Sequence, residues 1–151
     1  MLYLRTSRIA ELEGDPDVAA TWFADEEPLD LGTAWHGLHM LLTGSPWGGT
    51  PPLSDAVLGG TPLGDPSDRE PVRFVSSDQV VAVSGALPMA AALVPRFTHR
   101  AMRQGEVYPE SAWDREDALT GFLLPAYDEL VALFAAAAAA GEAVLITLDR
   151  D

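Results

Sequence analysis

The spacing of apolar residues predicts a chain rich in helices. Four apolar residues recur at steps of four, three and four and so share one helical face: Leu31, Trp35, Leu38 and Leu42. Asp30 precedes them at the position of an N-cap, and Gly44 follows them as a left-handed C-cap. The pattern therefore predicts a helix over residues 31–42.

A second apolar stripe predicts a long helical region near the end of the chain. Its members recur at steps of three and four: Leu119, Phe122, Leu123, Ala126, Leu130, Phe134 and Ala137. We expect Asp114 to cap the start of this region and Gly141 to cap its end. Pro125 lacks a backbone donor, so a kink or break is expected near Gly121.

The remaining pattern predicts short strands at the beginning, middle and end of the chain. They cover residues 1–6, 72–75 and 143–148, and shorter helices are expected at 7–13, 16–23, 76–87, 90–94 and 98–104. Residues 44–71 are rich in proline and glycine, with one short helix at 54–58. Such a long irregular segment is more often a binding or lid loop than a mere connector.

These elements predict one α+β domain over residues 1–151, with a small three- or four-stranded sheet covered by several helices. The length is that of a single domain, and 48% hydrophobic residues are enough for a proper core.

Charge is the unusual feature of the composition. With 23 acidic and 9 basic side chains, the net charge is −14, which repels nucleic acid and anionic membrane surfaces and attracts a basic protein partner. A charge that only keeps the protein soluble is the alternative. There is no cysteine, no signal peptide and no apolar run near the roughly 20 residues of a membrane span, so we expect a cytoplasmic protein.

His36 and His39 are candidates for chemistry because they lie three residues apart on the predicted helix. His36 lies toward the polar side and is the better candidate for proton transfer, whereas His39 borders the apolar face. A surface or hydrogen-bonded structural histidine is the alternative for both. Zinc motifs on helices space their histidines four apart with a glutamate between them, so we predict no metal and no cofactor.

Arg73 and Trp47 are the other candidate binding residues. Arg73 lies inside an apolar strand, so it needs an anion or carbonyl partner; that partner is a ligand or, as we favour, an acid such as Asp30 or Asp78. Trp47 lies in the proline- and glycine-rich loop. It either folds back on the core or serves as an anchor for a partner.

The chain also resembles the YfbM-like family of bacterial proteins, a domain of unknown function. The resemblance rests on segments taken in order: Leu29–His39, Leu41–Gly44, Pro52–Ser54, Leu58–Gly60, Pro71–Phe74, Tyr108–Pro109, Trp113–Asp114 and Gly141–Leu145. It implies a single α+β domain and a shared pocket around Trp35, His36, Gly37, His39 and Arg73. It implies no activity.

Two functions are compatible with these residues. The favoured one is a small acidic protein-binding module of the immunity or accessory type, because the charge is high and no full catalytic set is visible. The alternative is a small enzyme or ligand-binding protein with a pocket lined by Trp35, His36, His39 and Arg73. In that case His36 is the acid/base and Arg73 binds an anion.

Overall fold

The computed structural model describes residues 1–65 and 70–148. Residues 66–69 of the predicted loop and residues 149–151 of the predicted domain lie outside this description.

The strands form one antiparallel sheet in the order β2-β1-β5-β4-β3. Their bounds are β1 Leu2–Thr6, β2 Leu29–Asp30, β3 Thr61–Pro62, β4 Arg73–Val75 and β5 Ala143–Thr147. Tyr3 of β1 lies opposite Ile146 of β5, and Arg73 of β4 lies opposite the same residue from the other side. The α+β class is confirmed, but the sheet has five strands and not three or four. The two edge strands have two residues each, too few to show an alternating pattern.

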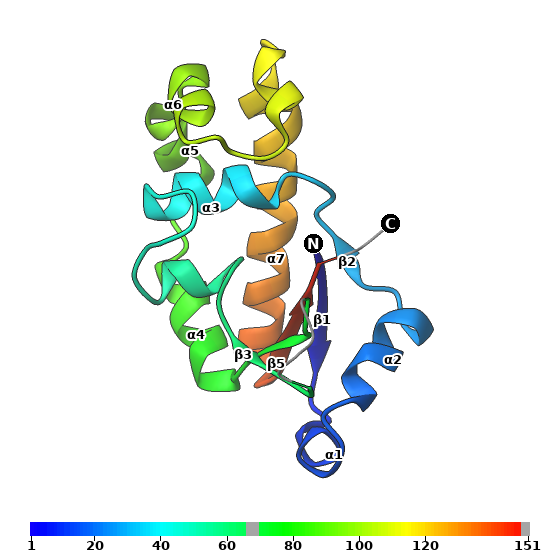
Figure 1. Ribbon diagram of the computed structural model, residues 1–151. Coiled ribbons are helices and arrows are strands. Elements are labelled where there is room, and N and C mark those ends of the chain that lie inside the picture. Colours follow the sequence, from blue (N-terminus) through cyan, green and yellow to red (C-terminus); the bar gives the residue numbers. More distant parts are fainter. Residues whose placement is uncertain (66–69, 149–151) are drawn as a thin grey trace.

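Helices cover both faces of this sheet (Figure 1). Side chains alternate along a strand, so Tyr3 and Ile146 join the larger core, which also contains residues of α3 (Trp35–Thr43), α4 (Ser77–Ala86) and α7 (Leu124–Ala140). Leu4 and Leu145 join a smaller cluster with residues of α1 (Ile9–Gly14) and α2 (Val18–Asp25). The core thus lies mainly between the sheet and α7.

Short helical segments complete the chain. They are η1 Leu53–Asp55, α5 Ala90–Leu93, η2 Val94–Arg96, α6 His99–Gln104, η3 Glu110–Asp114 and η4 Ala118–Leu123. Local capping explains two of the helix starts. Ser76 Oγ accepts a hydrogen bond from the Gln79 amide, and Gln79 Oε1 accepts one from the Ser76 amide. Thr98 Oγ1 accepts one from the Ala101 amide.

The helix predicted over 31–42 exists, but it begins at Trp35. Asp30 is not its N-cap: the residue belongs to β2, and its Oδ1 accepts a hydrogen bond from the Gly32 amide at 2.7 Å. Gly32 then adopts a φ of +58°, which turns the chain before the helix can start. Gly44 ends α3 in the left-handed conformation, as predicted.

The start of the long C-terminal helix also differs from the prediction. Asp114 ends η3 and does not cap α7, which begins at Leu124 with Pro125 in its first turn. Proline is tolerated there because α7 begins where the π-helical pattern of η4 ends, so no α-helical hydrogen bond is interrupted. The break expected near Gly121 is a π-helical segment, η4, and Gly141 caps α7 as predicted.

One helical stretch, Ala118–Ala140, has the length and composition of a membrane span, which the sequence pattern did not suggest. Core helices of soluble proteins share this length and composition. Tyr127, Leu130 and Phe134 of this stretch are buried in the core.

Gly37 lets α3 approach the C-terminal segment closely. A Cβ at this position would lie 2.7 Å from Leu123 Cδ2 and 2.9 Å from Trp113 Cη2, and both of those side chains are fully buried. Alanine normally stabilises a helix interior relative to glycine by about 1 kcal/mol. Here overpacking should outweigh that gain, so we expect Gly37→Ala to lower the free energy of unfolding by about 1 kcal/mol.

Gly85 of α4 is the matched control, because a Cβ there meets nothing within 4 Å. Gly85→Ala should raise the free energy of unfolding by about 0.5 kcal/mol. Urea denaturation followed by circular dichroism measures both variants. A stabilising effect of Gly37→Ala equal to that of Gly85→Ala would show that α3 does not need the close approach.

Candidate functional site: an aromatic groove

Helix α3 buries the candidate residues of the Trp-His-Gly-Leu-His segment. The exposed fraction is 7% for Trp35, 0% for His36 and 1% for His39. Two histidines with no access to solvent must find hydrogen-bond partners inside the protein. Their partners define the site.

His36 joins two loops that are distant in the sequence. Its Nδ1 accepts a hydrogen bond from the Tyr108 amide at 2.8 Å, so the proton of the neutral ring is on Nε2. Nε2 then donates to the Pro46 carbonyl oxygen at 2.8 Å. Burial lowers the pKa of His36, and the hydrogen bond to Pro46 only partly opposes this effect. Both nitrogens are engaged, so this geometry favours a structural role over proton transfer.

His39 holds the same loop one turn further along α3. Its Nε2 lies 2.7 Å from the Gly48 carbonyl oxygen and donates to it. Its Nδ1 is buried and has no hydrogen-bond partner within the described part of the chain. Burial is the main cause that lowers the pKa of His39, and the nearby His36 adds to it.

The two histidines therefore fix the peptide groups on either side of Trp47. This side chain is nevertheless 65% exposed. Its ring rests on His36 at a centroid distance of 4.2 Å and faces Trp35 at 6.2 Å. Trp47 thus folds back on the core only in part, because its ring contacts His36 while the residue remains largely exposed.

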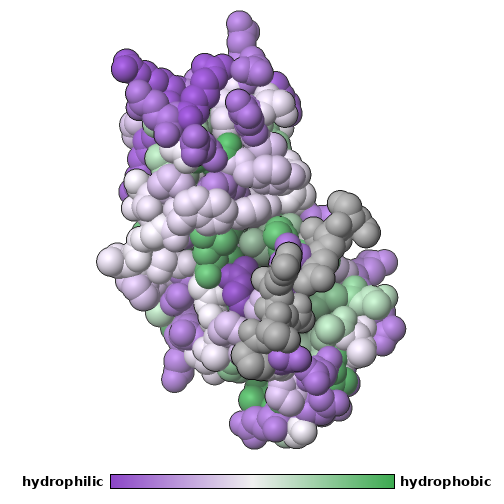
Figure 2. Space-filling model, in the orientation of Figure 1, coloured by the Kyte–Doolittle hydropathy of each residue, from purple (hydrophilic) through white to green (hydrophobic). Residues whose placement is uncertain are grey.

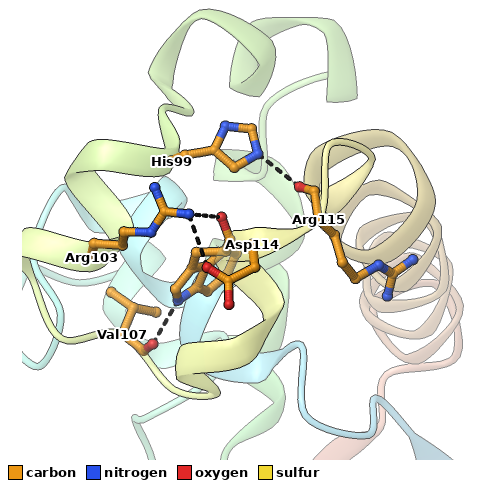
Figure 3. A network of polar contacts seen from close by, with 6 residues as sticks. His99, Arg103, Val107, Asp114 and Arg115 are labelled. Atoms are coloured by element: carbon orange, nitrogen blue, oxygen red, sulfur yellow. Dashed lines mark hydrogen bonds and ion pairs between the residues drawn. The ribbon is translucent and has the colours of Figure 1, made fainter.

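Tyr108 is held in a comparable way. Besides the bond of its amide to His36, the carbonyl of the preceding Val107 accepts a hydrogen bond from Trp113 Nε1 at 2.7 Å. Figure 3 shows this contact within a wider network in which Arg103 donates to the Trp113 carbonyl oxygen and pairs with Asp114. The Tyr108 side chain is 49% exposed, and its ring lies 5.9 Å from that of Trp35.

Trp35, Trp47 and Tyr108 form the walls of a surface groove with a volume of about 520 Å³. We call it the aromatic groove; it is completed by Met1, Asp30, Gly32, Thr33 and Leu148. Figure 2 shows hydrophilic residues gathered over the end that carries α6, and more neutral and apolar residues over the middle of the same face. Asp30 supplies the charged side chain of the lining.

Arg73 does not line this groove, although its Nη2 lies 3.6 Å from the sulfur of the lining residue Met1. Its Nη1 donates to the Gly59 carbonyl oxygen at 2.6 Å and its Nη2 to the Val57 carbonyl oxygen at 2.9 Å. The carbonyl partner expected from the sequence is present, whereas Asp30 and Asp78 are not its hydrogen-bond partners. Burial lowers the pKa of Arg73 from its ordinary value. The arginine ties the segment after η1 to the sheet.

The structure thus brings Trp35 and Trp47 together in the groove, while His36 and His39 lie behind it as supports. Sequence reasoning did not select Tyr108 and Asp30 as site residues. Tyr108 next to Pro109 in a turn between two helices was the one available signal for the former.

A second groove lies between α6 and η3 and shares Tyr108 with the first. Its volume is about 800 Å³, and its lining includes Arg103, Glu106, Glu110 and Asp114. No group of three or more residues that could hold a metal ion occurs in residues 1–65 and 70–148. Glu106, Glu110 and Asp114 are exposed and form a solvated rim of this groove.

Comparison with known families assigns the chain to one of them. A family model described as a domain of unknown function (DUF1877) matches residues 3–147, nearly the whole chain. The protein belongs to the DUF1877 family. None of the curated proteins matches it.

A solved structure supports the same assignment. The DUF1877 chain described here is similar to YfbM from Escherichia coli, a protein of unknown function, with a TM-score of 0.70 and 20% sequence identity. The match covers 98% of this chain and 100% of that one. The resemblance to the YfbM-like family is confirmed, and at this level of identity the likeness shows the fold alone.

Proposed function

We propose that this protein is a binding module of the immunity or accessory type, which captures a basic protein partner with its aromatic groove. The proposal rests mainly on Trp47. The residue is 65% exposed, while the buried His36 and His39 hold the carbonyl groups of its two neighbours.

An exposed tryptophan on a fixed loop has the properties of an interface anchor. Tryptophan and tyrosine dominate binding hot spots because they bury a large area with few rotatable bonds. Ordering a mobile loop on binding would cost free energy, and a loop that is already hydrogen-bonded avoids much of that cost. The histidines thus provide preorganisation.

The charge of the chain supports a basic partner. A net charge of −14 accelerates the encounter with a positively charged surface, and this effect weakens as salt screens it. The enzyme alternative has less support, because both nitrogens of His36 are engaged and neither His36 nor Arg73 lines the groove.

Capture of a partner should depend on Trp47. We expect Trp47→Ala to weaken capture at least tenfold, which corresponds to about 1.4 kcal/mol of lost anchor energy. The measurement is affinity capture from an extract of the source organism at low salt, quantified by mass spectrometry, with wild type and variant compared.

Met89→Ala is the matched control, since Met89 is 81% exposed and does not line the groove. It should capture the same partner as the wild type, and that partner should be basic and released by high salt. Equal capture by Trp47→Ala, an acidic partner, or no specific partner at low salt would each contradict the proposal.

A further inference from the structure

The aromatic groove combines π faces with one carboxylate. Its aromatic walls come from three segments far apart in the sequence: Trp35 from α3, Trp47 from the following loop and Tyr108 from the turn after α6. Asp30, at the end of β2, contributes the carboxylate. Aromatic faces attract cations within about 6 Å, and a carboxylate beside them strengthens that preference.

The carboxylate of Asp30 is oriented by the backbone. Its Oδ1 accepts a hydrogen bond from the Gly32 amide at 2.7 Å. A carboxylate has about four lone-pair positions, so one backbone bond leaves most of its capacity for a ligand. The terminal amino group of Met1 also borders the groove, but it donates to the Gly32 carbonyl oxygen at 3.2 Å. Asp30 and the overall charge of −14 oppose the repulsion that this amino group exerts on a cation.

We propose that the aromatic groove receives an arginine side chain of the basic partner, with the guanidinium on the indole of Trp47 and paired with Asp30. The inference rests on the proposed function and names the residue type that the groove selects. Arginine fits better than lysine because its planar guanidinium stacks on rings, binds a carboxylate through two donors, and is less strongly hydrated than an ammonium group. Charge complementarity favours it over an apolar anchor.

The test uses the whole protein and three short peptides: acetyl-Gly-Gly-Arg-Gly-Gly-amide and the same peptide with lysine or citrulline. Citrulline has nearly the shape of arginine without its charge. Binding is followed by NMR through the indole N–H signals of the four tryptophans. Trp22 serves as the internal reference, because it belongs to the smaller core cluster and does not line the groove.

We expect the arginine peptide to shift the signals of Trp35 and Trp47 at low salt, with at least tenfold higher affinity than the citrulline peptide and higher affinity than the lysine peptide. Asp30→Asn should lower the affinity for the arginine peptide at least threefold and leave the affinity for the citrulline peptide unchanged. Asn keeps an acceptor for the Gly32 amide. Glu129→Gln on the exposed side of α7 changes the net charge equally and should have no effect.

Equal binding of arginine and citrulline peptides would overturn the inference, as would shifts confined to Trp22 and Trp113, or no shift at any peptide concentration. Insensitivity to Asp30→Asn would overturn it too. Each of these results leaves the proposed function standing if Trp47→Ala still loses the basic partner, because an apolar residue would then occupy the groove. The proposed function itself would be contradicted if capture of the partner did not depend on Trp47.

Discussion

Replacing His36 with phenylalanine should lower the free energy of unfolding by about 3 kcal/mol. The variant keeps a planar ring but removes the partner of the Tyr108 amide and that of the Pro46 carbonyl group. Leaving a buried donor or acceptor without a partner costs about 1 to 3 kcal/mol for each group. Urea denaturation, followed by circular dichroism and by tryptophan fluorescence, measures the loss.

His99 supplies the control. Its ring is half-buried and makes one hydrogen bond, from Nε2 to the Arg115 carbonyl oxygen at 2.8 Å (Figure 3). His99→Phe should therefore cost only about 0.5 kcal/mol, since water can replace that bond. A loss below 1 kcal/mol for His36→Phe would mean that solvent reaches the two loops, and the idea of a fixed Trp47 would fail with it.

The pattern of apolar residues was sufficient to predict the central helices and strands. The apolar face of α3 and the buried Leu130, Phe134 and Ala137 of α7 follow from a period of 3.6 residues, which indicates the face that meets the core. The predicted stripe omitted Tyr127, which is buried, and included Ala126, which is only half-buried. The helices expected from residues 76 and 98 are capped by those residues, because Ser76 and Thr98 each accept a hydrogen bond from an amide three positions on. Such features depend on residues only a few positions apart, so a single sequence is enough to predict them.

The edge strands and the start of α3 could not be predicted in this way. Asp30 followed by Leu31 and Gly32 is compatible with an N-cap and with a turn; pairing of Leu29 with Tyr3 decides between them. That pairing joins residues 26 positions apart, and a two-residue strand has no period of its own. The aromatic groove has the same origin, since the bond of the Tyr108 amide to His36 joins residues far apart in the sequence and brings the Tyr108 ring beside Trp35.

Burial of the histidines was the least predictable feature of the site. The spacing of His36 and His39 places them on neighbouring positions of one helix, but it does not show which partner lies opposite. The loop that returns over α3 brings the Pro46 and Gly48 carbonyl groups to the two rings. The predicted catalytic candidate is thereby placed where it can organise the exposed aromatic side chains.

Arg73→Met should lower the free energy of unfolding by about 2 kcal/mol. Methionine keeps the apolar stem but leaves the carbonyl groups of Gly59 and Val57 without their charged donor. Hydrogen bonds to charged groups contribute about 1.5 to 3 kcal/mol, whereas the removal of a partly buried charge recovers some of the desolvation cost. The lost hydrogen-bond energy should exceed the recovered desolvation cost, because the guanidinium is only partly buried and two acceptors depend on it.

Arg100→Met, at an exposed position of α6, changes the net charge equally and should stay within about 0.5 kcal/mol of the wild type. If Arg73→Met is as stable as the wild type in urea, the cost of burying the guanidinium equals its bonding energy, and a ligand-binding role for Arg73 would again merit a test.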